Sequence, residues 1–241
     1  MMPVLELAVQ DAAGARIARE VGAARVELCA ALGTTGGLTP SIGLVESVAA
    51  VGVPVHALVR PRAGGFAYDA EEIAVTVRDI RSVLAAGATG VVVGAVRDGE
   101  VDLATVQRFV AAAEGAPVTF HRALDVVADP LRALPGLSAA GVVRVLTSGG
   151  AATCIEGVRM LARLAAAGSG LEIMAGGGVT VPDIPTLAAT GVDAVHLSAR
   201  RTVASPPAGP GGGPSSFDAT DPVLAHAAAR ALRCATARPA S

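Results

Sequence analysis

The chain has 241 residues, of which 52% are hydrophobic and 17% charged, and its formal net charge is -2. This composition excludes a disordered chain and provides enough apolar side chains for one sizeable core. One tyrosine, four phenylalanines and no excess of basic residues argue against a nucleic-acid-binding surface, and no apolar run is long enough to cross a membrane.

All 19 basic side chains are arginine, because the sequence contains no lysine. Schiff-base aldolases, pyridoxal-phosphate enzymes and P-loop NTPases each depend on a lysine and are therefore excluded in their usual form. Cys29, Cys154 and Cys234 lie far apart and form no CxxC pair, which indicates a reducing, cytoplasmic setting. We also expect no secretory signal, because no positive charge precedes the first apolar run.

Short runs rich in Val, Leu and Ile alternate along the chain with stretches of helical period and predict eight strands. The expected strands are 4–9, 25–29, 53–60, 90–94, 117–121, 143–147, 171–175 and 193–197. Capping residues predict where helices start. These are Asp69 with Glu72, Thr153 with Glu156, Pro40–Ser41, Asp102, Asp129–Pro130 and Asp221–Pro222. Glycines at the expected helix ends predict the stops: Gly22, Gly52, Gly87, Gly141, Gly168 and Gly191.

Eight strands alternating with eight helices predict a single (β/α)₈ TIM-barrel domain over residues 1–241. An open doubly wound sheet is the alternative, but the first strand–helix turn, residues 8–12, lacks its glycine fingerprint. The Pro/Gly-rich segment 203–216 predicts a flexible loop between the eighth strand and a last helix at about 219–234.

Strand parity predicts which side chains enter the barrel, because adjacent strand residues point to opposite faces. Assigning the apolar parity to the helices gives an outer set: Leu5, Leu7, Val9, Val26, Leu28, Val55, Ala57, Val59, Val118, Phe120, Val143, Val145, Ile173, Ala175, Val195 and Leu197. The opposite parity gives a largely polar interior set: Glu6, Arg25, Glu27, Cys29, His56, Leu58, Arg60, Thr119, His121, Arg144, Glu172, Met174, His196 and Ser198.

The interior charges divide by their position along the strands. Arg25, Arg144 and Glu172 open their strands, so we expect them to pair at the bottom of the barrel and fix it. Four side chains lie at or near the carboxyl ends of strands, where barrel active sites form, and are our candidate catalytic residues: Glu27, Arg60, His121 and His196. We expect Glu27 to pair with Arg60 when the site is empty, since an unpaired buried carboxylate is costly.

The loops at the same end supply candidate ligand-binding residues. Arginines and glycines gather there, and glycine after the seventh strand with polar groups after the eighth is where barrels often hold a phosphate. The candidates, with Glu6 deeper in the barrel, are Arg62, Arg122, Asp125, Ser148, Gly176, Gly177 and Ser198. They predict an anionic ligand.

Six motifs in this order resemble the CutC family, which is named for copper homeostasis. They are RVELC at 25–29, GGLTPS at 36–41, VRPR at 59–62, VTFHRALD at 118–125, RVLTSG at 144–149 and MAGGGV at 174–179. The resemblance, which runs from about residue 4 to 200, implies a cytoplasmic barrel protein, often a homo-oligomer, linked to copper tolerance. The sequence departs from the family at residues 63–66, which lack an acidic group, and at residues 7–9, which lack a cysteine.

Two functions remain open at this stage. A copper-handling protein would use Cys29, His121 and His196 as ligands, although Cu(I) favours several soft donors and Cys29 equally suits a small buried hydrophobe. An enzyme acting on a small anionic or phosphorylated metabolite would use Glu27 and His121 for proton transfer. Arginines would hold the anion of that metabolite: Arg60, Arg62 and Arg122.

Overall fold

The protein is described by a computed structural model that covers residues 2–206, 209–210 and 215–237. Within these residues eight parallel strands close into a barrel in the order β1-β10-β9-β8-β7-β4-β3-β2. The strands are β1 (Val4–Val9), β2 (Arg25–Leu28), β3 (Val55–Leu58), β4 (Gly90–Val93), β7 (Val118–Phe120), β8 (Arg144–Thr147), β9 (Glu172–Gly176) and β10 (Ala194–Leu197). The predicted strands are confirmed to within three residues at each end.

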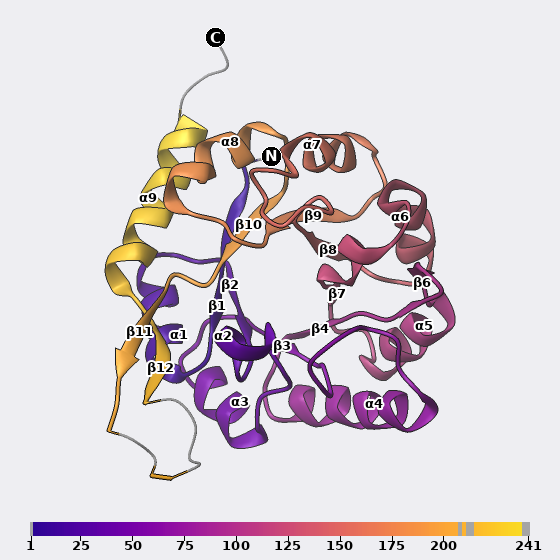
Figure 1. Ribbon diagram of the computed structural model, residues 1–241, viewed down its shortest axis with the longest axis horizontal. Helices are drawn as coiled ribbons and strands as arrows, with labels where there is room; N and C mark the ends of the chain where they lie inside the picture. Colours follow the sequence, from indigo (N-terminus) through magenta and orange to yellow (C-terminus); the bar gives the residue numbers. More distant parts are fainter. Residues whose placement is uncertain (1, 207–208, 211–214, 238–241) are drawn as a thin grey trace.

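Eight helices surround the barrel, one after each strand, in the part of the chain that the structure describes (Figure 1). They are α1 (Ala12–Glu20), α3 (Ile42–Ala49), α4 (Ala70–Ala85), α5 (Leu103–Ala112), α6 (Pro130–Ala139), α7 (Val158–Ala166), α8 (Ile184–Ala189) and α9 (Pro222–Ala237). The predicted (β/α)₈ barrel is therefore confirmed. None of the described helices is long and apolar enough to cross a membrane.

Most helix starts follow the predicted caps. Asp69 and Glu72 form a capping box at α4, and Ser41, Asp102 and Asp129 each accept from a backbone N–H of the first turn. The cap predicted at Thr153 is wrong, because α7 begins at Val158. The preceding turn crosses the loop after β8 so closely that a side chain on Gly157 would collide with the carbonyl oxygen of Ser148, and this crossing delays the helix.

Short elements extend the carboxyl ends of several strands. They are α2 (Leu32–Thr35), the hairpin of β5 (Val96–Arg97) and β6 (Glu100–Val101), and the 3₁₀ helices η1 (Arg122–Val126) and η2 (Val181–Asp183). The predicted loop 203–216 is wrong at both ends, because β11 (Arg200–Ala204) pairs with β12 (Ser216–Thr220). Backbone pairing from Arg200 to Thr220 outweighs the loop-like composition; residues 207–208 and 211–214 of the predicted loop lie outside the described residues.

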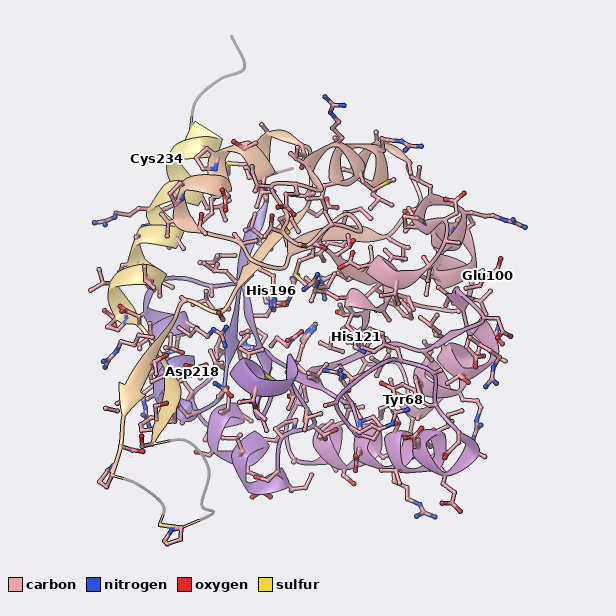
Figure 2. All side chains as sticks on the ribbon, in the orientation of Figure 1. Tyr68, Glu100, His121, His196, Asp218 and Cys234 are labelled. Atoms are coloured by element: carbon pink, nitrogen blue, oxygen red, sulfur yellow. The ribbon has the colours of Figure 1, made fainter. Side chains whose placement is uncertain are left out.

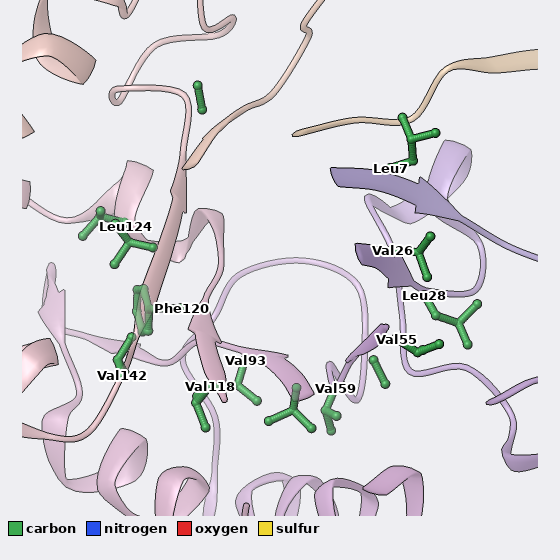
Figure 3. Close-up of a cluster of buried hydrophobic side chains, with 14 of the residues drawn as sticks. Leu7, Val26, Leu28, Val55, Val59, Val93, Val118, Phe120, Leu124 and Val142 are labelled. Carbon is green, nitrogen blue, oxygen red and sulfur yellow. The ribbon is translucent and has the colours of Figure 1, made fainter. Parts of the chain in front are cut away.

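The core between the barrel and the helices consists largely of the side chains that strand parity assigns to the outer face. Of the sixteen side chains assigned to the helices, all but Val143 belong to one buried cluster between barrel and helices (Figure 3). Val143 precedes β8 and is 44% exposed, so its predicted place is wrong. Inside the barrel, two smaller apolar clusters flank the polar residues: Cys29, Leu58 and Val92 on one side, and Leu146, Met174 and Ala194 on the other.

A network of ion pairs closes the bottom of the barrel, as the sequence predicts. Arg25 bonds Glu6 and, at 2.6 Å, Glu172, whose other oxygen accepts from Arg144 at 2.6 Å. Arg144 also donates to Thr119 at 3.0 Å. These contacts join strands β1, β2, β7, β8 and β9, so each buried charge has a partner of opposite sign.

We predict that Arg25→Leu destabilises the fold by about 3–5 kcal/mol, because it leaves the Glu6 and Glu172 carboxylates without this cation in a buried site. Arg97→Leu is the control, since the side chain of Arg97 is 60% exposed and its pair with Asp102 is worth less than about 1 kcal/mol. Urea unfolding followed by circular dichroism measures both. Equal losses of unfolding free energy in the two variants would contradict the role assigned to the network.

Candidate functional site

A pocket of about 310 Å³ opens at the carboxyl ends of the barrel strands. All four candidate catalytic side chains, Glu27, Arg60, His121 and His196, line it. The loops that follow the strands add further walls: Arg122, Gly177, Ser198 and Arg200. The rings of His121 and His196 lie inside the circle of strands, whereas Cys234 lies on the outer helix α9 (Figure 2).

Glu6 and His196 form a buried pair at the base of this pocket. They are register partners on β1 and β10, and the Nδ1 atom of His196 lies 2.7 Å from Oε1 of Glu6. Burial alone would raise the pKa of Glu6, but the hydrogen bond and charge of His196, together with Arg25, lower it to about 2. Because Glu6 is ionised, the Nδ1 atom of His196 carries a proton and donates a hydrogen bond to this carboxylate.

Glu27 lies beside that pair without a partner of its own. One of its carboxylate oxygens is within 4.8 Å of ligand atoms of both Glu6 and His196, and Oε2 makes no hydrogen bond to any described residue. Burial raises the pKa of Glu27 to about 7, with Glu6 adding to the rise and His196 opposing it. A carboxyl group with this pKa can give or accept a proton near neutral pH, as general acid–base catalysis requires.

His196 responds to the same neighbours in the opposite sense. Burial by itself would lower the pKa of His196, but the charge of Glu27 and the hydrogen bond to Glu6 raise it above its ordinary value. Glu27 and His196 therefore both have pKa values above their ordinary ones, and their titrations are coupled because the charge of each shifts the pKa of the other.

His121 is a neutral imidazole. Its Nδ1 accepts the backbone N–H of Ala123 at 3.1 Å, so the neutral ring carries its proton on Nε2. Burial and the nearby charge of Arg60 lower the pKa of His121 to about 3. The Nε2 atom is buried and makes no hydrogen bond within the described chain. His121 is therefore a neutral hydrogen-bond donor near neutral pH, and its role as the second proton-transfer group stays a prediction.

Each interior histidine packs against a glycine of a neighbouring strand. A Cβ atom on Gly94 would lie 2.3 Å from Cε1 of His121, and one on Gly176 would lie 3.1 Å from Cβ of His196. At the bottom of the barrel, Gly90 faces His56 in the same way, at 2.8 Å. The glycines are thus needed for space rather than for backbone conformation. Gly176, which we expected to bind ligand, makes room first for Leu146, whose Cδ1 would lie 2.3 Å from the added Cβ, and then for His196.

Arg60 does not pair with Glu27, and that expectation is wrong. Its Nη1 donates to the carbonyl oxygens of Thr35 at 2.8 Å and Gly37 at 3.0 Å, and its Nη2 donates to that of Gly64 at 2.7 Å. These carbonyls take both terminal nitrogens, so Arg60 joins two loops rather than presenting a bidentate fork. Its buried Nε is left without a partner in the described chain.

Arg62 lies outside the pocket, and its expected place in an anion clamp is wrong. It pairs with Glu72, the acid of the α4 capping box, and donates to backbone carbonyls of residues 63–67. Arg60 and Arg62 are two positions apart, so strand alternation would put both on one face. β3 ends at Leu58, however, and in the turn beyond it Arg60 faces the pocket while Arg62 faces α4. Arg62 therefore braces the loop against α4.

Arg122 is held over the rim of the pocket by buried partners. Its Nε donates to Asp125 at 2.8 Å and its Nη2 to Ser148 at 3.1 Å. Asp125 also accepts from Thr147 and from the backbone of Ser148, so it organises the loop after β8. Asp125 and Ser148, two expected ligand-binding residues, do not line the pocket but fix Arg122, which does.

The expected copper ligands Cys29, His121 and His196 do not form a three-donor group in the described part of the chain. Cys29 packs with Leu58 and Val92, and its Sγ lies 3.9 Å from the carbonyl oxygen of Val9. Burial raises the pKa of this thiol, which disfavours the thiolate that Cu(I) requires. The donor set of the site therefore does not fit Cu(I).

Glu6, Glu27 and His196 are the group with the spacing for a cation among the described residues. Both oxygens of Glu6 are already engaged, one by Arg25 and one by His196. A cation there would have to break one of these bonds or rely on Glu27 and His196 alone. The arrangement suits a proton relay better than a metal centre.

Sequence reasoning missed two side chains of the pocket wall, Phe66 and Arg200. The ring of Phe66 lies between Arg60, at 5.1 Å from its centroid, and His121, with the two ring centroids 4.7 Å apart. Phe66 comes from the long loop before α4. This loop has no helix or strand periodicity from which the position of its side chains could be predicted. Arg200 opens β11 just after β10, and its bond to Asp218 depends on the β11–β12 hairpin, which the composition of residues 203–216 does not predict.

The fold and the pocket define a (β/α)₈-barrel protein with a titratable polar site at the carboxyl ends of its strands. Residues 3–201 match the CutC family, and the chain belongs to that family. It is 46% identical over 200 residues to the family protein CutC of Klebsiella pneumoniae, covering 82% of this chain and 81% of that one. For the family protein CutC of Xanthomonas campestris the identity is 44% over 205 residues, covering 83% and 85%.

Solved structures agree with this assignment. The putative copper homeostasis protein CutC from Streptococcus agalactiae superposes with a TM-score of 0.75 at 28% identity, covering 81% of this chain and 98% of that one. A putative phosphonomutase from Burkholderia cenocepacia, at 20% identity and a TM-score of 0.60, covers 82% of this chain and 86% of that one and shares the fold alone.

We predict that Glu27→Gln raises the unfolding free energy at pH 8 but not at pH 5. The pKa of Glu27 in the fold, about 7, exceeds its ordinary 4.5, so the stability it contributes is present below pH 4.5 and lost as pH rises through 7. Replacing it with neutral glutamine avoids that loss, a gain on the order of 2 kcal/mol at pH 8. Urea unfolding at both pH values measures it, with the exposed Glu71→Gln as control. A loss of stability at pH 8 would show that the carboxylate is paired.

Proposed function

We propose that the pocket binds a small anionic metabolite and that Glu27, supported by the Glu6–His196 pair, transfers a proton on it. One observation carries the proposal: three buried polar atoms without partners among the described residues belong to side chains that line this one pocket. They are Oε2 of Glu27, Nε of Arg60 and Nε2 of His121. Buried polar groups are normally hydrogen-bonded, so these three unused donors and acceptors suit a polar ligand.

The charge around the pocket favours an anion. Arg60, Arg122 and Arg200 all line it, whereas Glu27 has its pKa raised to about 7 and so is only partly ionised at neutral pH. Arg122 crosses Gly177 so closely that a Cβ there would lie 2.8 Å from its Cζ. Gly177, at a φ of +123°, thus lets the guanidinium lie along the loop after the seventh barrel strand.

The proton-transfer role follows from the surroundings of Glu27. The anionic Glu6 orients His196, and a carboxylate oxygen of Glu27 lies within 4.8 Å of ligand atoms of both residues. A ligand group that reaches Glu27 would exchange a proton with it directly. Arg25 holds Glu6 from below, so the carboxylate that orients His196 stays in place while the proton moves.

Copper homeostasis is the second candidate, because the Streptococcus agalactiae relative is described as a putative copper homeostasis protein. For this chain the donor chemistry argues against tight Cu(I) binding, since one protonated thiol lies in an apolar cluster. A link to copper would therefore act through the metabolite site or through transient surface binding rather than through a buried thiolate centre.

We predict that an anion stabilises the protein through Arg122. Inorganic phosphate, glycerol 3-phosphate, dihydroxyacetone phosphate, pyruvate and citrate are screened by thermal shift at fixed ionic strength. At least one should raise the melting temperature, and Arg122→Gln should lower its affinity about tenfold because a charged donor is lost. Arg62→Gln is the matched control, as both arginine side chains are 42% exposed. No shift with any anion, or equal shifts in all three proteins, would refute the anion site.

We further predict that Cu(I) binds weakly and that Cys29→Ala leaves this binding unchanged. The thiol is buried and its pKa is raised, so forming a thiolate there is unfavourable. Competition with a Cu(I) chelator under anaerobic conditions gives the affinity. Tight binding of one copper per chain that disappears in Cys29→Ala would restore the copper-ligand hypothesis.

A further inference from the structure

His121 and Arg60 both line the pocket, and each has a buried side-chain nitrogen without a partner in the described chain. The tautomer of His121 is set by Ala123, whose N–H occupies Nδ1 and leaves the proton on Nε2. Three backbone carbonyls take both N–H groups of Arg60 Nη1 and one N–H of Nη2, which leaves Nε–H and the second N–H of Nη2. The buried Nε2 of His121 and Nε of Arg60 therefore each keep an N–H donor that no described residue accepts.

The ring of Phe66 contacts both of these side chains. Its ring contacts the His121 ring at a centroid distance of 4.7 Å, and Cζ of Arg60 lies 5.1 Å from the same centroid. His121 is also packed tightly against Gly94, where a Cβ atom would collide with its ring. Two positioned N–H donors in a buried, weakly solvated place stabilise an oxygen that gains negative charge, as oxyanion holes do.

Glu27 supplies the complementary group in the same pocket. Its Oε2 has no partner among the described residues, and one of its carboxylate oxygens lies within 4.8 Å of ligand atoms of Glu6 and His196. A pocket of about 310 Å³ has room for on the order of ten heavy atoms, so one small molecule that fills it contacts both the donors and Glu27. The groups therefore pair an oxyanion site with a carboxylate base.

We propose that the ligand is a small carbonyl compound bearing an anionic group, and that the protein enolises it. This inference rests on the proposed function of the same pocket. Glu27 removes a proton from the carbon next to the carbonyl, the C–H electron pair forms the new C=C bond, and the C=O π pair moves to oxygen. That oxygen accepts from Nε2–H of His121 and Nε–H of Arg60. Glu27 then returns the proton to carbon, so no oxidant, reductant or cofactor is consumed.

Proton exchange with solvent tests this step directly. The protein is incubated in D₂O with pyruvate or dihydroxyacetone phosphate, and loss of the C–H signal next to the carbonyl is followed by proton NMR. We expect at least one probe to exchange tenfold or more above the buffer rate. Glu27→Gln should bring the rate back to that of buffer, and His121→Leu should lower it about a hundredfold. His121→Gln, which keeps an N–H donor, should retain part of the rate. Arg62→Gln should exchange as the unmodified protein does.

The outcomes separate this inference from the function on which it rests. If a probe raises the melting temperature through Arg122 but its C–H bonds exchange no faster than in buffer, enolisation is wrong and the anion site stands. Exchange that is unchanged in Glu27→Gln, or equal in His121→Leu and the unmodified protein, also overturns the assignment of those residues. If no probe raises the melting temperature and none exchanges, the anion site and the enolisation both fall.

Discussion

The carboxylate of Glu6 connects the bottom of the barrel to its pocket. One oxygen accepts from Arg25, which belongs to the ion-pair network that closes the bottom, and the other bonds His196. Burial would protonate an isolated Glu6, but these two partners lower its pKa to about 2. The anion fixes the ring of His196, and the negative charge in turn helps to raise the pKa of Glu27. The chemistry at the mouth thus depends on an arginine at the bottom.

The two histidines of the pocket show how surroundings decide what one side chain does. His196 faces two carboxylates, Glu6 and Glu27, and these raise its pKa despite burial. His121 faces Arg60 and a backbone N–H, and burial together with that cation lowers its pKa to about 3. One ring therefore has a raised pKa beside two carboxylates, while the other is a neutral hydrogen-bond donor. Both need a glycine on the next strand, because a Cβ there would occupy the space of the ring.

Much of the fold and part of the site were predictable from local rules. Strand parity placed Glu6, Glu27, His121 and His196 inside the barrel, because alternation along a strand needs no knowledge of the neighbours. Partners were harder to predict. The bond expected between Glu27 and Arg60 does not exist, because backbone carbonyls from two loops reach the guanidinium first. No sequence pattern predicts the direction of a carbonyl group in a loop.

The sequence by itself determined the (β/α)₈ alternation, the caps of most helices, the parity of the strands and the absence of any lysine for Schiff-base chemistry. Tertiary structure decided which charges meet. Arg62 turns to Glu72 while Arg122 is held over Gly177, although both seemed equally suited to an anion. The physical reason is that parity and capping depend on residues within a few positions of each other. Ion pairs and pKa values depend instead on distances between strands far apart in the chain, which exist only once the barrel has closed.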